Sequence, residues 1–191
     1  MKKEKAKIFI ISGPSGAGED AVIDGLKNTL KFNPVVTTVT RQKRKGERQG
    51  HPYYFISNSR FEALIKEKQL VEWAVVYNVY RGCTFKEINR LLKLGQPIIW
   101  KVDWQGVRTI KKIFPQAVGI FITVPSYQVL VNRLVKRGLD SNQVIREREK
   151  FTKDWLKHKN IYDYIVVNKD GALKKTIEKI GEIIKKEMVK P

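Results

Sequence analysis

With 191 residues, 42% of them hydrophobic and 30% charged, the chain can form one globular domain with a sizeable core; this composition excludes a disordered protein, and the apolar runs are too short for a membrane span. The net charge of +19 fits a nucleic-acid binder or a lysine-rich surface around a nucleotide pocket, and the scattering of lysines along the whole chain favours the second. The single cysteine, Cys83, excludes an internal disulfide and predicts a reducing, cytoplasmic location.

The chain opens with a predicted buried strand that runs into a glycine-rich loop. Residues 8–11 are apolar, three glycines follow within six positions, and apolar residues at helical spacing predict a helix over residues 20–30. A strand, a glycine-rich loop and a helix in this order are typical of a P-loop, in which backbone N–H groups and the helix N-terminus surround a phosphate. The residues expected to form the nucleotide-binding loop are Gly13, Ser15, Gly16, Ala17, Gly18 and Glu19.

The loop departs from the P-loop pattern at its end. Lysine and then serine or threonine should follow the last glycine, but the chain has Glu19 and Asp20. The cation that should reach the terminal phosphates is therefore missing. Taken alone, the loop is equally compatible with a helix that packs close to a sheet and carries two acids in its first turn.

The remaining elements alternate between strand and helix, except between residues 35 and 95. Strands are predicted over residues 35–40, 53–56, 70–76, 97–102, 118–124 and 164–167. Helices are predicted over residues 57–68, from Thr84, over 126–136, through much of 138–160, and from Leu173 onward. Alternation of buried strands with helices predicts an α/β fold, in which helices wrap a parallel sheet and ligands bind at the carboxyl ends of the strands. Residues 35–95 are predicted to form an inserted, mostly β substrate subdomain.

Three further groups of residues carry chemistry. Arg41 and Arg44, with Tyr53 nearby, form a plausible clamp for a phosphate dianion, because guanidinium groups match phosphate geometry. The carboxylate of Glu72 could accept hydrogen bonds from the N1–H and N2–H₂ groups of guanine. A third group of arginines could close over transferring phosphates as part of a lid; it consists of Arg133, Arg137, Arg146 and Arg148. Each group is also compatible with ordinary solvated surface.

In combination, these motifs resemble those of guanylate kinases over nearly the full chain. The matching segments, in family order and spacing, are 13–18, 41–55, Glu72-Trp73, Asp103-x-Gln105-Gly106, Arg137-Gly138 and Tyr162-Asp163-Tyr164. The resemblance implies a P-loop NTPase core (residues 1–34, 96–136 and 161–191), a mostly β GMP-binding insertion (35–95) and a helical lid (137–160). It also implies Mg²⁺-dependent transfer of the γ-phosphate of ATP to GMP.

The resemblance further implies roles for individual residues. The GMP phosphate would be held by Thr37, Arg41, Arg44 and Tyr53, with Arg81 in place of a family tyrosine and Tyr80 as another source of the phenol. The guanine base would be bound by Glu72 and Asp103, beside Cys83 in place of a family serine. Arg137 and Arg148 would be lid arginines that act on the phosphates, and Asn168 would lie near the adenine.

Lys101 is a further departure from the family. It stands where guanylate kinases usually have the first acid of an Asp-x-Asp pair, at the end of the strand beside the phosphate loop. The loop has thus lost a lysine and gained an acid, while the neighbouring strand has lost an acid and gained a lysine. Our hypothesis is that Lys101 takes the catalytic role of the missing lysine, that Glu19 orients it, and that Asp20 helps to hold Mg²⁺.

Other functions stay open. Glu19 supports a catalytically inactive relative that binds GMP or a phosphopeptide through Arg41, Arg44 and Tyr53. A sugar-phosphate kinase on the same scaffold is opposed by Glu72 and the intact basic loop, and nucleic-acid binding is disfavoured by the scattered lysines. The expected partners are the nucleotides GMP and ATP, without a membrane, for a monomer or weak homodimer.

Overall fold

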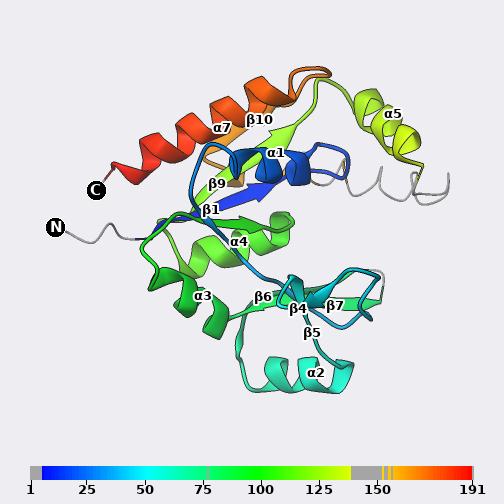
Figure 1. Ribbon diagram of the computed structural model, residues 1–191, viewed down its shortest axis with the longest axis vertical. Coiled ribbons are helices and arrows are strands. Elements are labelled where there is room, and N and C mark those ends of the chain that lie inside the picture. The colour runs from blue at the N-terminus through cyan, green and yellow to red at the C-terminus, as the bar shows by residue number, and fades with distance from the viewer. Residues whose placement is uncertain (1–5, 77, 139–151, 153–154, 156, 191) are drawn as a thin grey trace.

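Two β-sheets and the helices around them make up the described part of the chain. The computed structural model describes residues 6–76, 78–138, 152, 155 and 157–190. The first sheet is the parallel one expected of an α/β fold, and the second is smaller and mixed. In Figure 1 the second sheet and one helix lie below the parallel sheet, at one end of the molecule.

The parallel sheet has five strands in the order β10-β9-β1-β8-β2. Their bounds are β1 Ile8–Ser12, β2 Asn33–Pro34, β8 Ile98–Lys101, β9 Val118–Thr123 and β10 Tyr164–Val167. All four pairings are parallel, and β1 lies between β8 and β9. Because β1 is central and fully buried, the loop that follows it is held at the middle of the carboxyl edge.

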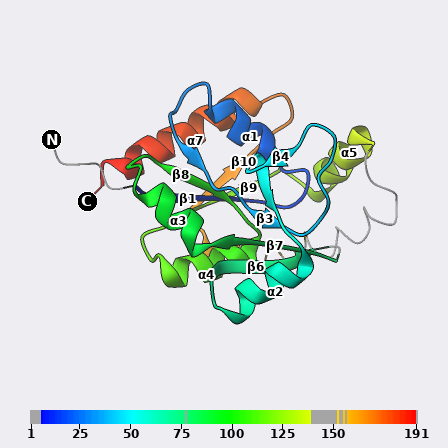
Figure 2. The same ribbon diagram turned by 60° about the horizontal axis from the view of Figure 1, so that its bottom comes forward.

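Helices cover both faces of this sheet. One face packs against α1 (Glu19–Leu26), α7 (Leu173–Met188) and part of α5 (Tyr127–Arg137), and the other against α3 (Phe85–Leu92) and α4 (Trp104–Ile113). Figures 1 and 2 show α1 and α7 on one side and α3 and α4 on the other. The strands are therefore apolar on both faces, as buried parallel strands must be. The α4 helix was not predicted; the side chain of Asp103 caps it by accepting from the Gly106 N–H at 2.8 Å.

The second sheet has the strand order β4-β5-β3-β7-β6, and α2 (Asn58–Lys66) lies beside it in Figure 2. Its strands are β3 Thr38–Val39, β4 Arg48–Gln49, β5 Pro52–Phe55, β6 Leu70–Val76 and β7 Val79–Thr84. This sheet falls within the segment predicted to be an insertion. The prediction of one strand over residues 35–40 is wrong, because the chain crosses there from one sheet to the other. The Val35 N–H still bonds to Ile99 of the parallel sheet, whereas Thr38 pairs with Tyr54 and Gly82.

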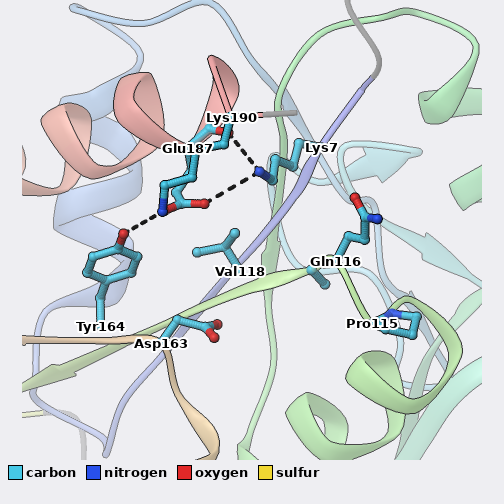
Figure 3. A pocket seen from close by; sticks show the side chains of 9 residues that line it. Lys7, Pro115, Gln116, Val118, Asp163, Tyr164, Glu187 and Lys190 are labelled. Atoms are coloured by element: carbon cyan, nitrogen blue, oxygen red, sulfur yellow. Dashed lines mark hydrogen bonds and ion pairs between the residues drawn. The ribbon is translucent and has the colours of Figure 1, made fainter.

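A network of charges fixes the C-terminal helix to the amino edge of the parallel sheet (Figure 3). Glu187 of α7 is buried and accepts hydrogen bonds from Lys7, Lys190 and Tyr164, with Tyr164 at 2.5 Å. These side chains line a cavity of about 420 Å³ together with Pro115, Gln116, Ala117, Val118 and Asp163. Both lysines are engaged by Glu187, so an anionic ligand would have to break a buried ion pair, and we interpret the network as structural.

No helix in the described segments combines the length and apolar content needed to traverse a lipid bilayer.

Candidate active site

The loop after β1 has the backbone geometry of an anion cradle. A Cβ atom at Gly13 would lie 2.4 Å from the carbonyl oxygen of Ile122, so only glycine fits this close approach. Gly18 has φ 99°, in the left-handed region, and caps the N-terminus of α1. The loop therefore delivers its last residues directly to the positive end of a helix.

Two side chains hold this loop from outside. Asn168 Nδ2 donates to the Ala17 carbonyl at 2.8 Å, and Arg133 donates to the Gly16 carbonyl at 3.2 Å and to the Asn168 carbonyl at 2.8 Å. Because a trans peptide points its N–H opposite to its C=O, holding the Ala17 carbonyl outside turns the Gly18 N–H the other way. Arg133, which was expected to close over phosphates, therefore supports the loop from outside. The amide of Asn168 is engaged by the loop and by Thr176, and its place near the adenine stays a prediction.

Lys101 points its amine at the start of the helix that follows the loop. Lys101 pairs in register with Ile11, two residues before Gly13, and its Nζ donates to Asp20 Oδ1 at 2.5 Å. Desolvation lowers the pKa of Lys101, but the charge and hydrogen bond of Asp20 outweigh it, with smaller contributions from Tyr53 and Glu19, and the net shift is upward. The carboxylate that orients Lys101 is thus that of Asp20, whereas the sequence hypothesis assigned this part to Glu19.

Glu19 lies in the cradle itself. Desolvation raises its pKa to about 7, although the backbone N–H groups of Glu19 and Gly18 and the charge of Lys101 act in the opposite direction. Its carboxylate thus interacts with the N–H groups that a phosphate would use. At neutral pH Glu19 is divided between its charged and protonated forms, so the loop is less hostile to an anion than its sequence suggests.

The predicted phosphate clamp is assembled around Glu47. Arg41 donates to both oxygens of Glu47, at 2.7 and 2.5 Å, and the Arg44 N–H donates to the same carboxylate at 2.8 Å. These bonds, the one from Arg41 first, lower the pKa of Glu47 to about 2. The Arg41 guanidinium also lies 5.3 Å from the ring centroids of Tyr53 and Phe55. Arg41 is therefore already aligned on a two-oxygen anion.

Other clamp residues lie on neighbouring strands. The Thr37 carbonyl accepts from the Tyr54 N–H at 2.9 Å, which joins the backbone of Thr37 to the strand that carries Tyr53. Arg81 pairs with Val39 across β7 and β3, and its Nε is buried without a hydrogen-bond partner among the described residues. An orphaned buried N–H of this kind suits an anionic ligand.

Tyr80 faces the side of the sheet opposite to Arg81, the other residue of its strand that was predicted to bind the phosphate. Successive residues of a strand point to opposite faces, so Tyr80 faces away from Arg81. The Tyr80 ring stacks on Phe61 of α2 at 5.1 Å, and its hydroxyl donates to Glu62 at 3.4 Å. The expectation that Tyr80 supplies a phenol to the GMP phosphate is corrected accordingly.

Two acids from different parts of the fold meet where the guanine base was predicted to bind. Glu72 comes from β6 and Asp103 follows β8, and α4 packs against β6. Desolvation, and then the charge of Asp103, raise the pKa of Glu72 to about 8. Cys83 pairs with Glu72 across the two strands and is fully buried. Burial, and then the charge of Glu72, raise the pKa of its thiol well above the usual range.

The lid falls largely outside the described residues. Arg148 and Arg146 lie in the part that the structure does not describe, and Arg137 is the last residue of α5, without a described side chain. The roles assigned to Arg137 and Arg148 therefore stay predictions.

Three contacts around the site were not predicted. Nothing in the sequence indicated that Glu47 pairs with Arg41, or that Glu87 binds residues of other segments. Ser12 shares a hydrogen bond of 2.8 Å with the Tyr162 hydroxyl, which accepts from Trp155 Nε1 at 2.9 Å. For Glu87 a signal existed, since Thr84 and Glu87 have the spacing of a helix capping box, but it indicates only a local bond.

Comparisons with known proteins identify the family of the chain. The family model described as guanylate kinase matches residues 5–187. The guanylate kinase of Rickettsia prowazekii is 39% identical, and the match covers 98% of this chain and 95% of that protein; that of Coxiella burnetii is 38% identical, over 86% and 80%. The crystal structure of guanylate kinase from Anaplasma phagocytophilum superposes with a TM-score of 0.76 at 26% identity, covering 100% of this chain and 90% of that one. The chain belongs to the guanylate kinase family of nucleoside monophosphate kinases.

Proposed function

We propose that this protein transfers the γ-phosphoryl group of ATP to GMP, and that Lys101 supplies the positive charge that its phosphate loop lacks. The observation that carries the proposal is the ion pair of Lys101 with Asp20 at the start of α1. A unit charge about 4 Å from a phosphate is worth roughly 4 kcal/mol at an effective dielectric constant of about 20. A loop with Glu19 in place of lysine needs a compensation of this size.

The acceptor phosphate of GMP would be bound by Thr37, Arg41, Arg44, Tyr53 and Arg81. Arg41 supports this role most directly, because it holds the Glu47 carboxylate in the two-pronged geometry that a guanidinium uses for phosphate. The phosphate would replace or share this contact. The charge of Tyr53 is one of the smaller influences on the pKa of Lys101, which supports a clamp that faces the loop across the site.

The guanine base would be read by Glu72 and Asp103. Guanine presents N1–H and N2–H₂ as donors on one edge, and two neighbouring carboxyl groups can accept them. The buried Cys83 thiol lies beside Glu72 and is a weaker partner than the family's serine. An adenine base lacks the same donors, so this pair of acids would favour GMP over AMP.

The residues present fit Mg²⁺ bound together with ATP. Mg²⁺ is held by one or two carboxylates, substrate phosphates and waters, rather than by a cage of protein ligands. The Asp20 side chain is 80% exposed at the loop, and no group of three or more possible metal ligands occurs in the described residues. When bound with ATP, Mg²⁺ would neutralise phosphate charge, and Asp20 would hold it while keeping Lys101 in place.

Catalysis would then consist of positioning and charge stabilisation. An oxygen of the GMP phosphate attacks the γ-phosphorus of ATP, the bond from that phosphorus to the β,γ-bridging oxygen breaks, and ADP leaves. The nucleophile is already an anion, so the enzyme need not supply a general base. Arg41 and Arg44 hold the acceptor, while the loop N–H groups and Lys101 stabilise the charge on the transferred group. Arg137 and Arg148 would complete this environment from the lid. Asn168 would position ATP, the phosphoryl donor, by holding the phosphate loop.

An inactive GMP- or phosphopeptide-binding protein is the second candidate, and Glu19 is the observation that favours it. When ionised, Glu19 competes with phosphate for the N–H groups of Gly18 and Glu19. The clamp and the guanine acids do not depend on the loop, so GMP binding could survive without turnover. For either function we place the protein in the cytoplasm, as a monomer or weak homodimer that acts on free nucleotides.

A coupled assay separates these functions. With ATP and Mg²⁺, GMP should give ADP and GDP, and AMP, CMP and UMP should react at least about 100-fold more slowly. Binding of GMP without turnover would favour the inactive protein, and turnover of ribose phosphates in place of GMP would favour a sugar-phosphate kinase.

A further inference from the structure

Glu87 is a buried carboxylate that lies behind the predicted phosphate clamp. It occupies the first turn of α3, whose Ile88 and Leu91 pack into the core of the parallel sheet. Its exposure is only 3%. A buried carboxylate is costly unless it is paired and hydrogen-bonded, so its partners indicate what it holds together.

The first partner is Arg90 on the same helix. Arg90 donates from Nε to Glu87 Oε2 and from a terminal nitrogen to Oε1, both at 2.9 Å. This pair neutralises the charge of Glu87 and fixes the plane of its carboxylate. The remaining acceptor sites therefore point in fixed directions.

Two partners come from other segments. The Val36 N–H, in the crossing between the two sheets, donates to Oε1 at 3.2 Å, and the Tyr54 hydroxyl of β5 donates to Oε2 at 3.3 Å. Glu87 thus joins α3, which is anchored in the core, to the crossing segment and to the second sheet.

Each of these segments carries a clamp residue next to the one that Glu87 binds. Val36 precedes Thr37, and Tyr54 follows Tyr53. The Tyr54 N–H bonds to the Thr37 carbonyl at 2.9 Å, so the two segments are also joined directly. Because neighbouring residues of a strand face opposite ways, Glu87 holds Tyr54 from the side away from the Tyr53 ring.

We infer that Glu87 is a positioning residue for the acceptor nucleotide: from behind the clamp it fixes Thr37 and Tyr53 relative to the core. This inference rests on the proposed function, because it assigns the GMP phosphate to that clamp. Glu87 touches no phosphate itself. Its loss should weaken GMP binding and leave ATP binding unchanged.

The test compares Glu87→Ala, Glu87→Gln and Tyr54→Phe. Glu87→Ala leaves the donor groups of three residues without their acceptor. It should raise the KM for GMP about tenfold, with kcat and the KM for ATP within about twofold of wild type. Glu87→Gln keeps one of the two acceptor oxygens and should raise the KM for GMP less than Glu87→Ala does. Tyr54→Phe removes a single bond and should raise the KM for GMP about threefold.

Glu62→Ala is the matched control. Glu62 also accepts a hydrogen bond from a tyrosine of the second sheet, Tyr80, but on the face away from the clamp. The KM of the Glu62→Ala variant for GMP should therefore equal that of wild type. An unchanged KM for GMP in Glu87→Ala, or an equal rise in KM for both nucleotides, would overturn the inference. If Glu87→Ala does not fold, the same criteria apply to Tyr54→Phe.

Titration of GMP by calorimetry separates this inference from the proposed function. If the wild-type protein binds GMP without turnover, the proposed kinase fails, and the dissociation constants of the same variants still test Glu87. If the variants bind GMP as wild type does while the kinase is active, only the inference about Glu87 fails.

Discussion

Lys101 Nζ and Asp20 Oδ1 lie 2.5 Å apart, although 81 positions separate the two residues in the chain. The pair joins the end of β8 to the first turn of α1, beside the phosphate loop. The Asp20 side chain is 80% exposed and that of Lys101 is about half-buried, so the pair contributes little to stability. Its significance lies in the placement of a positive charge beside a loop that has lost its own lysine.

Glu19→Gln should make ATP binding less dependent on pH. Desolvation raises the pKa of Glu19 to about 7, so the side chain is mostly protonated at pH 6 and mostly anionic at pH 8. Repulsion of the ATP phosphates by the anion should raise the wild-type KM for ATP as pH increases. The ratio of wild-type to Glu19→Gln KM should therefore grow by about tenfold from pH 6 to pH 8, measured at saturating GMP.

The protonation of ATP itself changes with pH and affects both proteins equally. Only the ratio of their KM values for ATP therefore reports on Glu19. Glu178→Gln, on the exposed face of α7, is the control and should follow wild type. A constant ratio across this range would contradict the prediction.

The upward shift in the pKa of Glu19 means that the folded state retains a proton that the unfolded chain releases. The contribution of Glu19 to stability accordingly falls as pH rises from 4.5 to about 7.

GMP binding should release a proton from Glu72. Desolvation and the charge of Asp103 raise the pKa of Glu72 to about 8, so the free protein carries the proton at pH 7. The N–H donors of guanine favour the ionised carboxylate and should lower that pKa on binding. Calorimetric titrations in two buffers of different ionisation enthalpy should give up to about one proton released per GMP at pH 7.

In Glu72→Gln the proton release should disappear and the affinity for GMP should fall about 100-fold, because one acceptor is replaced by a donor that faces guanine N–H groups. Proton release of the same size in wild type and in Glu72→Gln would show that another group titrates.

Glu187→Gln should destabilise the fold without changing the site. Desolvation acts to raise the pKa of Glu187, but hydrogen bonds from Lys190, Tyr164 and Lys7 lower it to about 2. The depressed pKa stabilises the folded state above pH 4.5, and this contribution is lost as pH falls toward 2. Urea denaturation at pH 7 should show a loss of about 2 kcal/mol in the free energy of unfolding, and the difference should shrink toward pH 2.

Asp24→Asn is the control for Glu187. Asp24 pairs with Lys27 on an exposed face of α1, so its loss should change the free energy of unfolding by less than about 0.5 kcal/mol. Equal losses in the two variants would contradict the structural role given to the buried network.

The sequence predicts those parts of the fold that depend on local patterns. The apolar strands at 97–102, 118–124 and 164–167, the helices that begin near Ser57 and Thr84, and the parallel sheet predicted from the alternation are all found. The elements that were not predicted are the strands β2, β4 and β7 and the helix α4. The two-residue strands β2 and β4 are too short to show a pattern. The β7 strand contains Gly82 and lacks a clear alternation, and α4 follows Asp103 with a glycine in its first turn.

The site is less predictable because its contacts join distant residues. The relocation of a lysine to the loop was expected from the substitution at position 101, but its partner depends on side-chain directions at the start of α1. The face on which Tyr80 lies depends on strand register, which the sequence around β7 does not specify. Glu87 binds residues of three segments, whereas the capping-box spacing of Thr84 and Glu87 indicates only a bond at the start of α3.

The central claim is that Lys101 replaces the loop lysine, and kcat/KM for ATP in Lys101→Ala tests it most directly. The value should fall about 100-fold or more, given the free energy of one charge beside a phosphate. Lys111→Ala, which removes a lysine paired with Asp163 away from the site, should change it less than about twofold. Returning a lysine to the loop with Glu19→Lys in the Lys101→Ala background should recover activity, whereas a wild-type kcat/KM in Lys101→Ala alone would contradict the account.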